Sequence, residues 1–234
     1  MSGNAQEKTA TPQTGAVLLA AGMSTRMGAQ NKLLLPFGRG TMIGHMVGVL
    51  RAARLTELVV VLGHEADQVR AALEAANPPD APGCPLRVVE HPHFAEGMGS
   101  SLKAGLRALS AGLEAVMVCL TDQPLLETAD VNRLVTAMGT TLTGQGGKNI
   151  IVPFHGGQRG NPVLFSAHYL EEVLATRGPI AGCRGIVQRY PNAVLAVEME
   201  TDHILRDIDT PEDYQALMAS LEPPANPRAA ATNP

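Results

Sequence analysis

Residues 15–32 read GAVLLAAGMSTRMGAQNK, and this stretch decides the fold. Its first six residues are a continuous apolar run with the length of a strand that is buried on both faces. The run leads directly into a loop of small residues and glycines, which carries the cationic side chains Arg26 and Lys32. In open α/β sheets, ligands bind beyond the carboxyl ends of the strands. The loop after this first strand is therefore the first place to look for chemistry.

The same alternation of strand and helix continues along the chain. Short apolar runs predict further strands over residues 58–62, 86–89, 115–120, 149–153, 162–165 and 193–197. Apolar side chains at helical spacing predict helices over residues 41–53, 64–76, 98–110, 130–138, 167–176, 186–190 and 211–221, with a polar loop over 140–148. Such alternation gives right-handed crossovers and a mostly parallel sheet with helices on both faces. We therefore expect a three-layer, Rossmann-like α/β fold.

Composition narrows the classes of protein and of partner. The chain is 45% hydrophobic and 3% aromatic with a net charge of −4, and it has neither a basic stripe nor an aromatic platform for nucleic acid. Its three cysteines are far apart without a CxxC pair, which favours a reducing cytoplasm over a disulfide framework. No apolar stretch approaches the roughly 18 residues of a membrane span. We expect one domain over residues 15–221 between flexible tails at 1–14 and 222–234.

The glycine loop has the composition of a phosphate-binding loop. Gly22 and Gly28 allow backbone N–H groups to approach phosphate oxygens, while Arg26 offers a planar fork and Lys32 a point charge. Neither the GxGxxG nor the GxxxxGK[ST] pattern is present. On spacing alone, an ordinary glycine turn with surface cations explains these residues equally well.

Acidic residues occur where a metal could meet those phosphates. Asp122 directly follows the strand over 115–120, where a carboxylate can hold Mg²⁺, although a turn residue is the commoner explanation. Asp207 and Asp209 alternate along an extended segment and so point to opposite sides. We prefer Asp209 as the second metal ligand because it directly precedes Thr210-Pro211, with Asp207 as the alternative.

These motifs together resemble a known family. Residues 19–28 with Lys32 are similar to the LAAGxSxRMG…K signature of nucleotidyltransferases related to the molybdenum-cofactor guanylyl- and cytidylyltransferases, and DQP at 122–124 and DIDTPEDY at 207–214 resemble its acidic motifs. The resemblance covers roughly residues 15–221. It implies a nucleotidyltransferase fold, Mg²⁺ on Asp122 and Asp209, and catalytic roles for Arg26, Lys32 and Asp122. The nucleotide-binding residues that it implies are Ala20, Ala21, Gly22, Ser24, Arg26, Gly28 and Lys32.

Three further residues, Ser100, Asn161 and Arg184, carry expectations from this resemblance, and Gly63 carries one from its place after the strand over 58–62. Ser100 in GMGSSL would contact the nucleotide, although capping of a helix is the simpler role, and Gly63 would approach the nucleotide closely or serve as a turn. Asn161 in RGNPVLF and Arg184 would contact the acceptor substrate. The string around Arg184 lacks the acidic residue that many relatives carry, so the resemblance specifies the acceptor less firmly than nucleotide transfer.

The Ala20-Ala21-Gly22 variant resembles the cytidylyl branch. It implies transfer of CMP from CTP to the terminal phosphate of the molybdenum cofactor, forming molybdopterin cytosine dinucleotide and pyrophosphate, with transient contact to a molybdenum hydroxylase. The alternatives are a GTP donor or a sugar- or polyol-phosphate acceptor, a nicotinamide-dependent oxidoreductase, and a non-catalytic chaperone for the cofactor.

Overall fold

The computed structural model describes residues 11–28, 30–78, 80–144, 149–176 and 183–221. Its strands are β1 (Thr14–Ala20), β2 (Pro36–Phe37), β3 (Gly40–Thr41), β4 (Glu57–Leu62), β5 (Leu86–Glu90), β6 (Ala115–Leu120), β7 (Ile150–His155), β8 (Gln158–Arg159), β9 (Val163–Ser166) and β10 (Val194–Glu198). Its α-helices are α1 (Met42–Arg51), α2 (Ala66–Ala76), α3 (Met98–Ala108), α4 (Thr128–Thr143), α5 (Leu170–Ala175), α6 (Cys183–Arg189) and α7 (Pro211–Leu221).

The main sheet has the strand order β10-β7-β9-β6-β1-β4-β5, with β8 paired to β7. Strands β6, β1, β4 and β5 are parallel, and β10 is parallel to β7. Strand β9 is antiparallel to both of its neighbours, β6 and β7. It is therefore reversed relative to both, and the loop that leads into it lies at the edge where β1 and β6 end.

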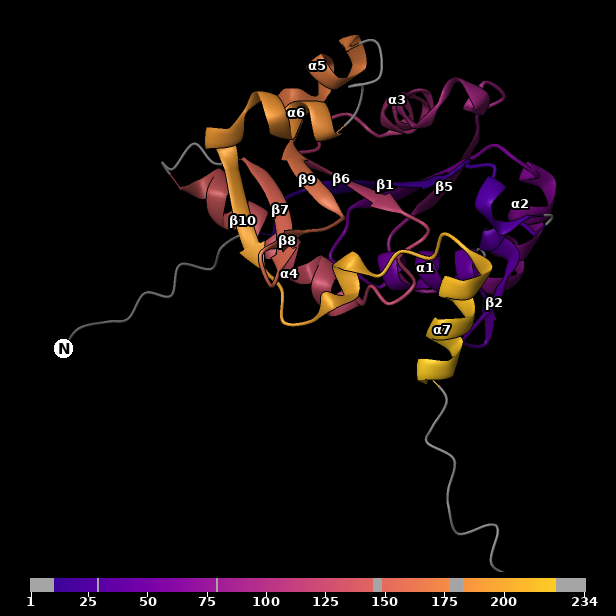
Figure 1. Ribbon diagram of the computed structural model, residues 1–234. Helices are drawn as coiled ribbons and strands as arrows, with labels where there is room; N and C mark the ends of the chain where they lie inside the picture. Colours follow the sequence, from indigo (N-terminus) through magenta and orange to yellow (C-terminus); the bar gives the residue numbers. More distant parts are fainter. Residues whose placement is uncertain (1–10, 29, 79, 145–148, 177–182, 222–234) are drawn as a thin grey trace, which may run out of the picture.

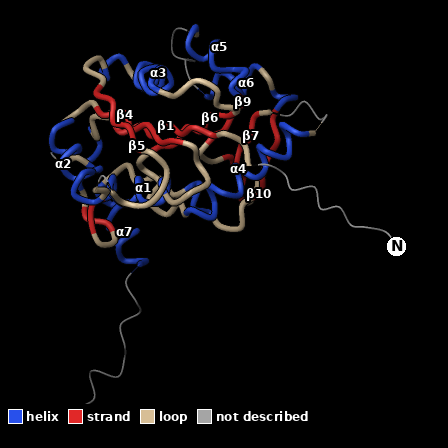
Figure 2. Tube along the Cα trace, turned by 180° about the vertical axis from the view of Figure 1, so that it is seen from behind, coloured by secondary structure: helices blue, strands red, loops and turns tan. Residues whose placement is uncertain are grey.

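Helices cover both faces of the sheet, as the alternation predicts. One face carries α1, α2 and α4, with a core that includes Met46, Leu73 and Leu134, and the other carries α3, α5 and α6, with Leu106 and Ile186. Figure 1 shows these layers above and below the sheet, and Figure 2 shows the sheet from behind, running between them. The expected three-layer α/β architecture with a mostly parallel sheet is confirmed.

Helix α7 packs beside the β2–β3 hairpin, away from the main sheet. Its Leu217 packs with Phe37, Met42 and Ile208 in a small separate cluster. Pro211 begins the helix, as expected from its fixed φ. The packing of Ile208 fixes the extended segment before α7 at the carboxyl edge of the sheet.

Some expected boundaries are wrong. Helix α4 continues through Thr143 into the segment expected to be a loop, because the Thr140 and Thr143 hydroxyls donate to backbone carbonyls of the preceding turn instead of ending it. Strand β1 begins at Thr14, within the expected tail, and Gln13 N donates to Glu114 Oε2 at 2.8 Å. Residues 1–10 and 222–234 of the two expected tails lie outside the described part of the chain.

No helix in the described ranges combines the length and apolarity that a membrane span needs.

Candidate functional site

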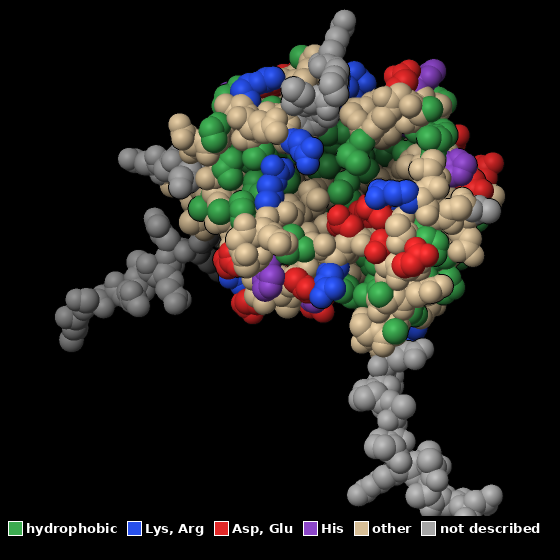
Figure 3. Space-filling model, in the orientation of Figure 1, with side chains coloured by type: hydrophobic (Ala, Val, Ile, Leu, Met, Phe, Trp, Pro, Cys, Tyr) green, Lys and Arg blue, Asp and Glu red, His purple; other side chains and the backbone are tan. Residues whose placement is uncertain are grey.

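Two adjoining clefts open where β1 and β6 end. The smaller has a volume of about 350 Å³ and is lined by the loop after β1 and the loop after β6. The larger has a volume of about 1310 Å³. Both include Leu19, Gly97, Met98 and Leu120 in their walls. Figure 3 shows this hollowed face, with apolar side chains in the hollow and Lys or Arg side chains on both sides of it. The arrangement can hold two ligands side by side.

The loop after β1 has a fixed, irregular backbone. Ser24 has a φ of 50°, and its Oγ accepts a hydrogen bond from the backbone N of Lys32 at 3.3 Å. Gly28 has φ 68° and ψ −125°, a conformation that only glycine adopts without strain. The short 3₁₀ turn η1 (Thr25–Met27) buries Met27 in the core. This backbone directs both Arg26 and Lys32 into the smaller cleft.

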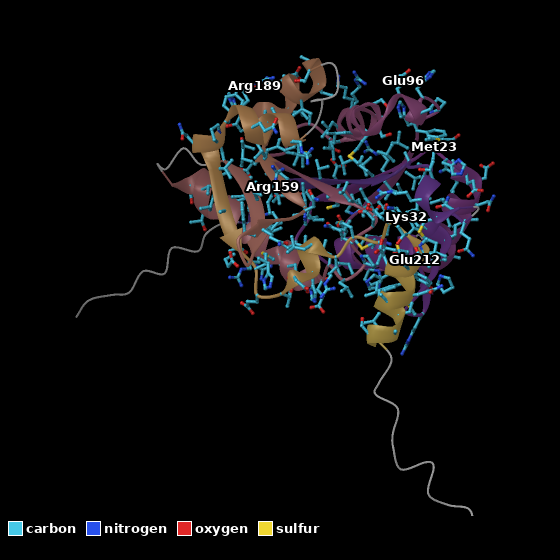
Figure 4. All side chains as sticks on the ribbon, viewed as in Figure 1. Met23, Lys32, Glu96, Arg159, Arg189 and Glu212 are labelled. Carbon is cyan, nitrogen blue, oxygen red and sulfur yellow. The ribbon has the colours of Figure 1, made fainter. Side chains whose placement is uncertain are left out.

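The ammonium group of Lys32 lies between two carboxylates. Its Nζ is 2.9 Å from Asp122 Oδ2 and 3.4 Å from Asp209 Oδ1, and it donates to the carbonyl of Ile208 at 3.2 Å. Arg26 joins the cluster through a 2.9 Å contact to Asp209 Oδ1. Figure 4 labels Lys32 between the sheet and α7, at the meeting point of these segments. Three segments distant in sequence therefore bring two cations and two carboxylates together.

Asp122 is anchored through its backbone and leaves one carboxylate oxygen without a partner. Its carbonyl accepts a hydrogen bond from Ile208 N at 2.7 Å. Its Oδ1 is buried, and the described part of the protein offers this atom no hydrogen bond. A buried carboxylate oxygen without a partner costs free energy, and a cation removes that cost. This orphaned atom therefore fits a bound metal ion.

The donor set suits a hard divalent cation such as Mg²⁺ or Mn²⁺. Mg²⁺ in proteins is usually bound by one or two carboxylates, with water and substrate phosphates as the other ligands. Within the described ranges, no group of three or more His, Cys, Asp or Glu side chains is placed to bind a metal by itself. Asp122 and Asp209 supply two carboxylates, so nucleotide phosphates and water would have to complete the coordination.

Asp207 faces a different environment from Asp209. Its Oδ1 accepts a hydrogen bond from Gln123 Nε2 at 2.8 Å. Burial raises the pKa of the Asp207 carboxyl, and the nearby negative charge of Asp122 raises it further. Asp209 instead contacts the cations Lys32 and Arg26. Of the two candidates for second metal ligand, the structure therefore places Asp209 with the cations and Asp207 against Gln123.

The larger cleft contains both residues expected to contact the acceptor, Asn161 and Arg184. Ser100, an expected nucleotide contact, also lines this cleft and not the smaller one. The Ser100 hydroxyl is already engaged, because it donates to Gly97 O at 2.8 Å and lies 3.0 Å from His91 Nε2. Ser100 lies in the first turn of α3 but does not cap this helix, because the N-cap is Gly97 and the Ser100 hydroxyl donates to a carbonyl instead of accepting from a backbone N–H.

Three expected nucleotide contacts line neither cleft. Ala20 is buried within β1, and Gly28 serves the shape of the loop. Close packing explains the glycine at position 63, because a Cβ added there would lie 2.7 Å from Phe94 and 2.8 Å from the Ala21 side chain. Any role of these three residues in nucleotide binding would be indirect. Of the other expected nucleotide contacts, Ser100 lines the larger cleft, and the rest line the smaller one: Ala21, Gly22, Ser24, Arg26 and Lys32.

Sequence reasoning missed several residues of the clefts. Lys103, Arg107 and Arg159 line the larger one. Met23 and Met98 line the smaller one although their side chains are 51% and 65% exposed. An exposed methionine in a glycine loop is a usable signal, because such loops otherwise favour polar residues. The cationic residues come from separate elements, and no local pattern connects them.

Comparison with known proteins places this site within a family. Residues 16–198 match the model of the MobA-like NTP transferase domain. The nicotine blue oxidoreductase of Paenarthrobacter nicotinovorans is 29% identical, over 88% of this chain and 97% of that protein. The molybdenum cofactor cytidylyltransferase of Escherichia coli K12 is 28% identical, over 85% of this chain and 92% of that protein.

Comparison with solved structures gives matches over a similar share of the chain. The crystal structure of Rv0371c from Mycobacterium tuberculosis superposes with a TM-score of 0.71 at 28% identity, over 90% of this chain and 100% of that one. A manganese complex of the same protein superposes with a TM-score of 0.65 at 27% identity, over 89% and 100%. The segment that matches the family model includes the loop after β1 and Asp122, the main parts of the cluster described above. This chain belongs to the family of MobA-like NTP transferase domains, and it is a nucleotidyltransferase of that family.

Proposed function

We propose that this chain transfers CMP from CTP to the terminal phosphate of the molybdenum cofactor, giving molybdopterin cytosine dinucleotide and pyrophosphate. The observation that carries the proposal is the cluster of Lys32, Asp122 and Asp209, with the unpartnered Oδ1 of Asp122 beside a glycine loop. Such a cluster suits a triphosphate that is bound together with Mg²⁺.

The transfer requires that the two phosphate groups are held in position and that their negative charge is neutralised. An oxygen of the acceptor phosphate forms a bond to the α-phosphorus of CTP, the bond between that phosphorus and the bridging oxygen breaks, and pyrophosphate leaves with the electron pair. The nucleophile is already an anion, so no general base is needed. Lys32 and Arg26 would hold the phosphates and stabilise the charge that develops on the leaving group. Bound Mg²⁺, held by Asp122 and Asp209, would neutralise phosphate charge.

The choice of donor and acceptor has narrower support. The Ala20-Ala21-Gly22 sequence resembles the cytidylyl branch, and the Escherichia coli relative named above is a molybdenum cofactor cytidylyltransferase. The larger cleft, at about 1310 Å³, has room for an acceptor of the size of a pterin derivative beside the nucleotide. GTP as donor, or a sugar or polyol phosphate as acceptor, would use the same phosphate and metal contacts.

Calorimetry of CTP and GTP binding, each with and without Mg²⁺, tests the donor. We expect CTP to bind with Mg²⁺, GTP to bind at least about tenfold more weakly, and Asp122→Asn to abolish the effect of Mg²⁺. Release of pyrophosphate on addition of the molybdenum cofactor would then demonstrate transfer. Preference for GTP would refute the cytidylyl assignment. Binding of the cofactor without pyrophosphate release would instead indicate a chaperone.

A second candidate is a nicotinamide-dependent oxidoreductase. It is favoured by the relative named nicotine blue oxidoreductase, which aligns over 97% of its length. The pairing of carboxylates with Lys32 is a feature that phosphoryl chemistry uses and hydride transfer does not need. Fluorescence titration with NADH and NADPH separates the two: binding of either at micromolar concentration, with no effect of Mg²⁺ on CTP binding, would replace our first proposal.

A further inference from the structure

The larger cleft is strongly cationic in a chain whose net charge is −4. Among the described residues, six basic or imidazole side chains line it against the single carboxylate of Glu96: His91, His93, Lys103, Arg107, Arg159 and Arg184. They come from the segment after β5, from α3, from β8 and from α6, so the charge arises from the folded arrangement. A concave surface of one sign concentrates ligands of the opposite sign. This cleft is built for an anion.

Arg159 and Arg184 form the most distinctive part of this surface. Arg159 is exposed at the surface, yet desolvation by the surrounding cleft lowers the pKa of its guanidinium, and the positive charge of Arg184 lowers it further. The other influence on this pKa is the thiol of Cys183, and no carboxylate in the described ranges contributes. Two guanidinium groups that repel each other without a nearby acid gain free energy when an anion binds between them.

This pair lies apart from the site of nucleotide transfer. Arg159 lies in β8 and Arg184 in α6, and neither lines the smaller cleft that holds Lys32 and Asp122. Figure 4 shows Arg159 and Lys32 apart from each other, Arg159 on the left of the view and Lys32 on the right. A phosphate that attacks the α-phosphorus must lie near Lys32, because the triphosphate site is there. The arginine pair would therefore contact a different part of the acceptor.

We propose that Arg159, together with Arg184, binds a second anionic group of the acceptor, remote from the phosphate that reacts. This inference rests on the proposed nucleotide transfer and specifies the class of acceptor within it. The acceptor is a phosphate monoester with a further oxyanion or metal–oxo group at its far end. The same cleft is also lined by Leu102, Val118 and Val163, against which a flat ring system of the acceptor can pack. A simple sugar phosphate carries one anionic group and leaves the pair unused.

The first test measures protection of the arginines from phenylglyoxal, which modifies guanidinium groups, with molybdate as the anionic probe. Saturating CTP and Mg²⁺ fill the smaller cleft, and the modified peptides are quantified by mass spectrometry. We expect molybdate to slow modification of Arg159 and Arg184 several-fold relative to chloride at equal ionic strength. Arg39 is exposed in the turn between β2 and β3 and lines neither cleft, so its modification should be unchanged. Equal rates at Arg159 with and without molybdate would overturn the proposal.

The second test uses substitution and the molybdenum cofactor. We expect Arg159→Gln to raise the KM for the acceptor about tenfold or more, the loss typical of a charge-assisted contact. The KM for CTP should stay within about twofold, because the nucleotide cleft is untouched. Arg159→Lys should recover part of the loss, since lysine keeps the charge but not the fork, and Arg39→Gln should match the wild type.

The outcomes separate this inference from the proposed function. Normal magnesium-dependent CTP binding with an unchanged acceptor KM in Arg159→Gln would refute the arginine site and leave nucleotide transfer standing. A rise in the KM for CTP equal to that for the acceptor would also refute it, because the change would then be a general disturbance. Absence of magnesium-dependent CTP binding in the wild type would refute the proposed function itself.

Discussion

Replacing Lys32 by methionine should destabilise the protein in the absence of Mg²⁺, and Mg²⁺ should restore much of the loss. With an effective dielectric constant of about 20, the Lys32–Asp122 contact at 2.9 Å corresponds to about 6 kcal/mol of gross attraction, and the Asp209 contact at 3.4 Å to about 5 kcal/mol. Desolvation and side-chain entropy offset most of this, since the Lys32 side chain is only 14% exposed. Removal of one partner also leaves two carboxylates facing each other. We expect a net loss of about 2–3 kcal/mol.

Thermal unfolding with EDTA and with Mg²⁺ measures this effect. A loss of this size lowers the Tm by roughly 4–12 °C for a chain of this length. Mg²⁺ should stabilise the variant more than the wild type, because the metal then supplies the positive charge that the carboxylates lack. The exposed pair Arg70–Glu90, at 3.3 Å, is the matched control, and Arg70→Gln should cost less than about 1 kcal/mol.

The double variant Lys32→Met/Asp122→Asn isolates the coupling between the two side chains. It should be more stable than the sum of the single changes indicates, because neutralising Asp122 removes the repulsion that the first change exposes. An unfolding midpoint of Lys32→Met equal to that of the wild type in EDTA would refute this reasoning. Equal stabilisation of both proteins by Mg²⁺ would refute the placement of the metal.

Other features give independent predictions. Gly105→Ala places a Cβ 2.4 Å from Val17 and 2.8 Å from Val61, so we expect it to lower the free energy of unfolding in urea by about 1–3 kcal/mol. The matched change Gly48→Ala meets nothing within 4 Å and should raise the free energy of unfolding by about 0.5–1 kcal/mol, because alanine favours the helix α1. The reverse order of stability would contradict the packing of α3 on the sheet. Asp207→Asn should stabilise the protein at pH 7. The pKa of the Asp207 carboxyl is raised in the folded state, so the wild type loses stability as the pH rises from 3.8, the pKa in the unfolded chain, through the folded-state pKa. The stability gained by the substitution should therefore disappear below pH 3.8. A gain that persists at low pH would refute the electrostatic cause. Burial raises the pKa of Cys183 to about 12, although this residue lines the larger cleft, and burial raises the pKa of Cys119 still further. At pH 8 the buried Cys119 thiol should therefore react slowly with Ellman's reagent until guanidinium unfolds the chain, whereas the partly buried Cys183 should react before unfolding; rapid reaction of Cys119 in the native protein would contradict its burial.

Much of the fold is predictable because its signals are local. The runs that form β1, β4 and β6 are almost wholly apolar, and such runs have few alternatives to a buried strand. The end of α4 is not predictable, because Thr140 and Thr143 discourage helix in isolation yet hydrogen-bond back to their own helix. The start of α7 at Pro211 is predictable, because the proline ring itself constrains the backbone.

The candidate site also contains some residues with a local sequence signal and others whose role depends on contacts between distant segments. Residues inside a contiguous motif, such as Arg26 and Lys32, become candidates through resemblance to a family signature, as does Asp122, and the structure brings all three to one cleft. The role of Gly63 depends on how closely Phe94 packs against it, which no sequence pattern records. Arg159 is visible in its motif, but its significance depends on Arg184 from a different element. Long-range juxtaposition of like charges has no local signal.

The reversed strand β9 has a consequence for how such a protein can diversify. Because β9 runs against both neighbours, the short loop with Gly160 and Asn161 reaches the ligand-binding edge before the strand begins. The loop after β1 and Asp122 precede β7 in the chain, whereas Asn161 and Arg184 of the opposite wall come from β7 onward. We therefore expect the segment from β7 to β10 to influence which partner molecule is accepted. Grafting residues 150–198 of a relative onto this chain should change the preference for that molecule while the loop after β1 stays in place.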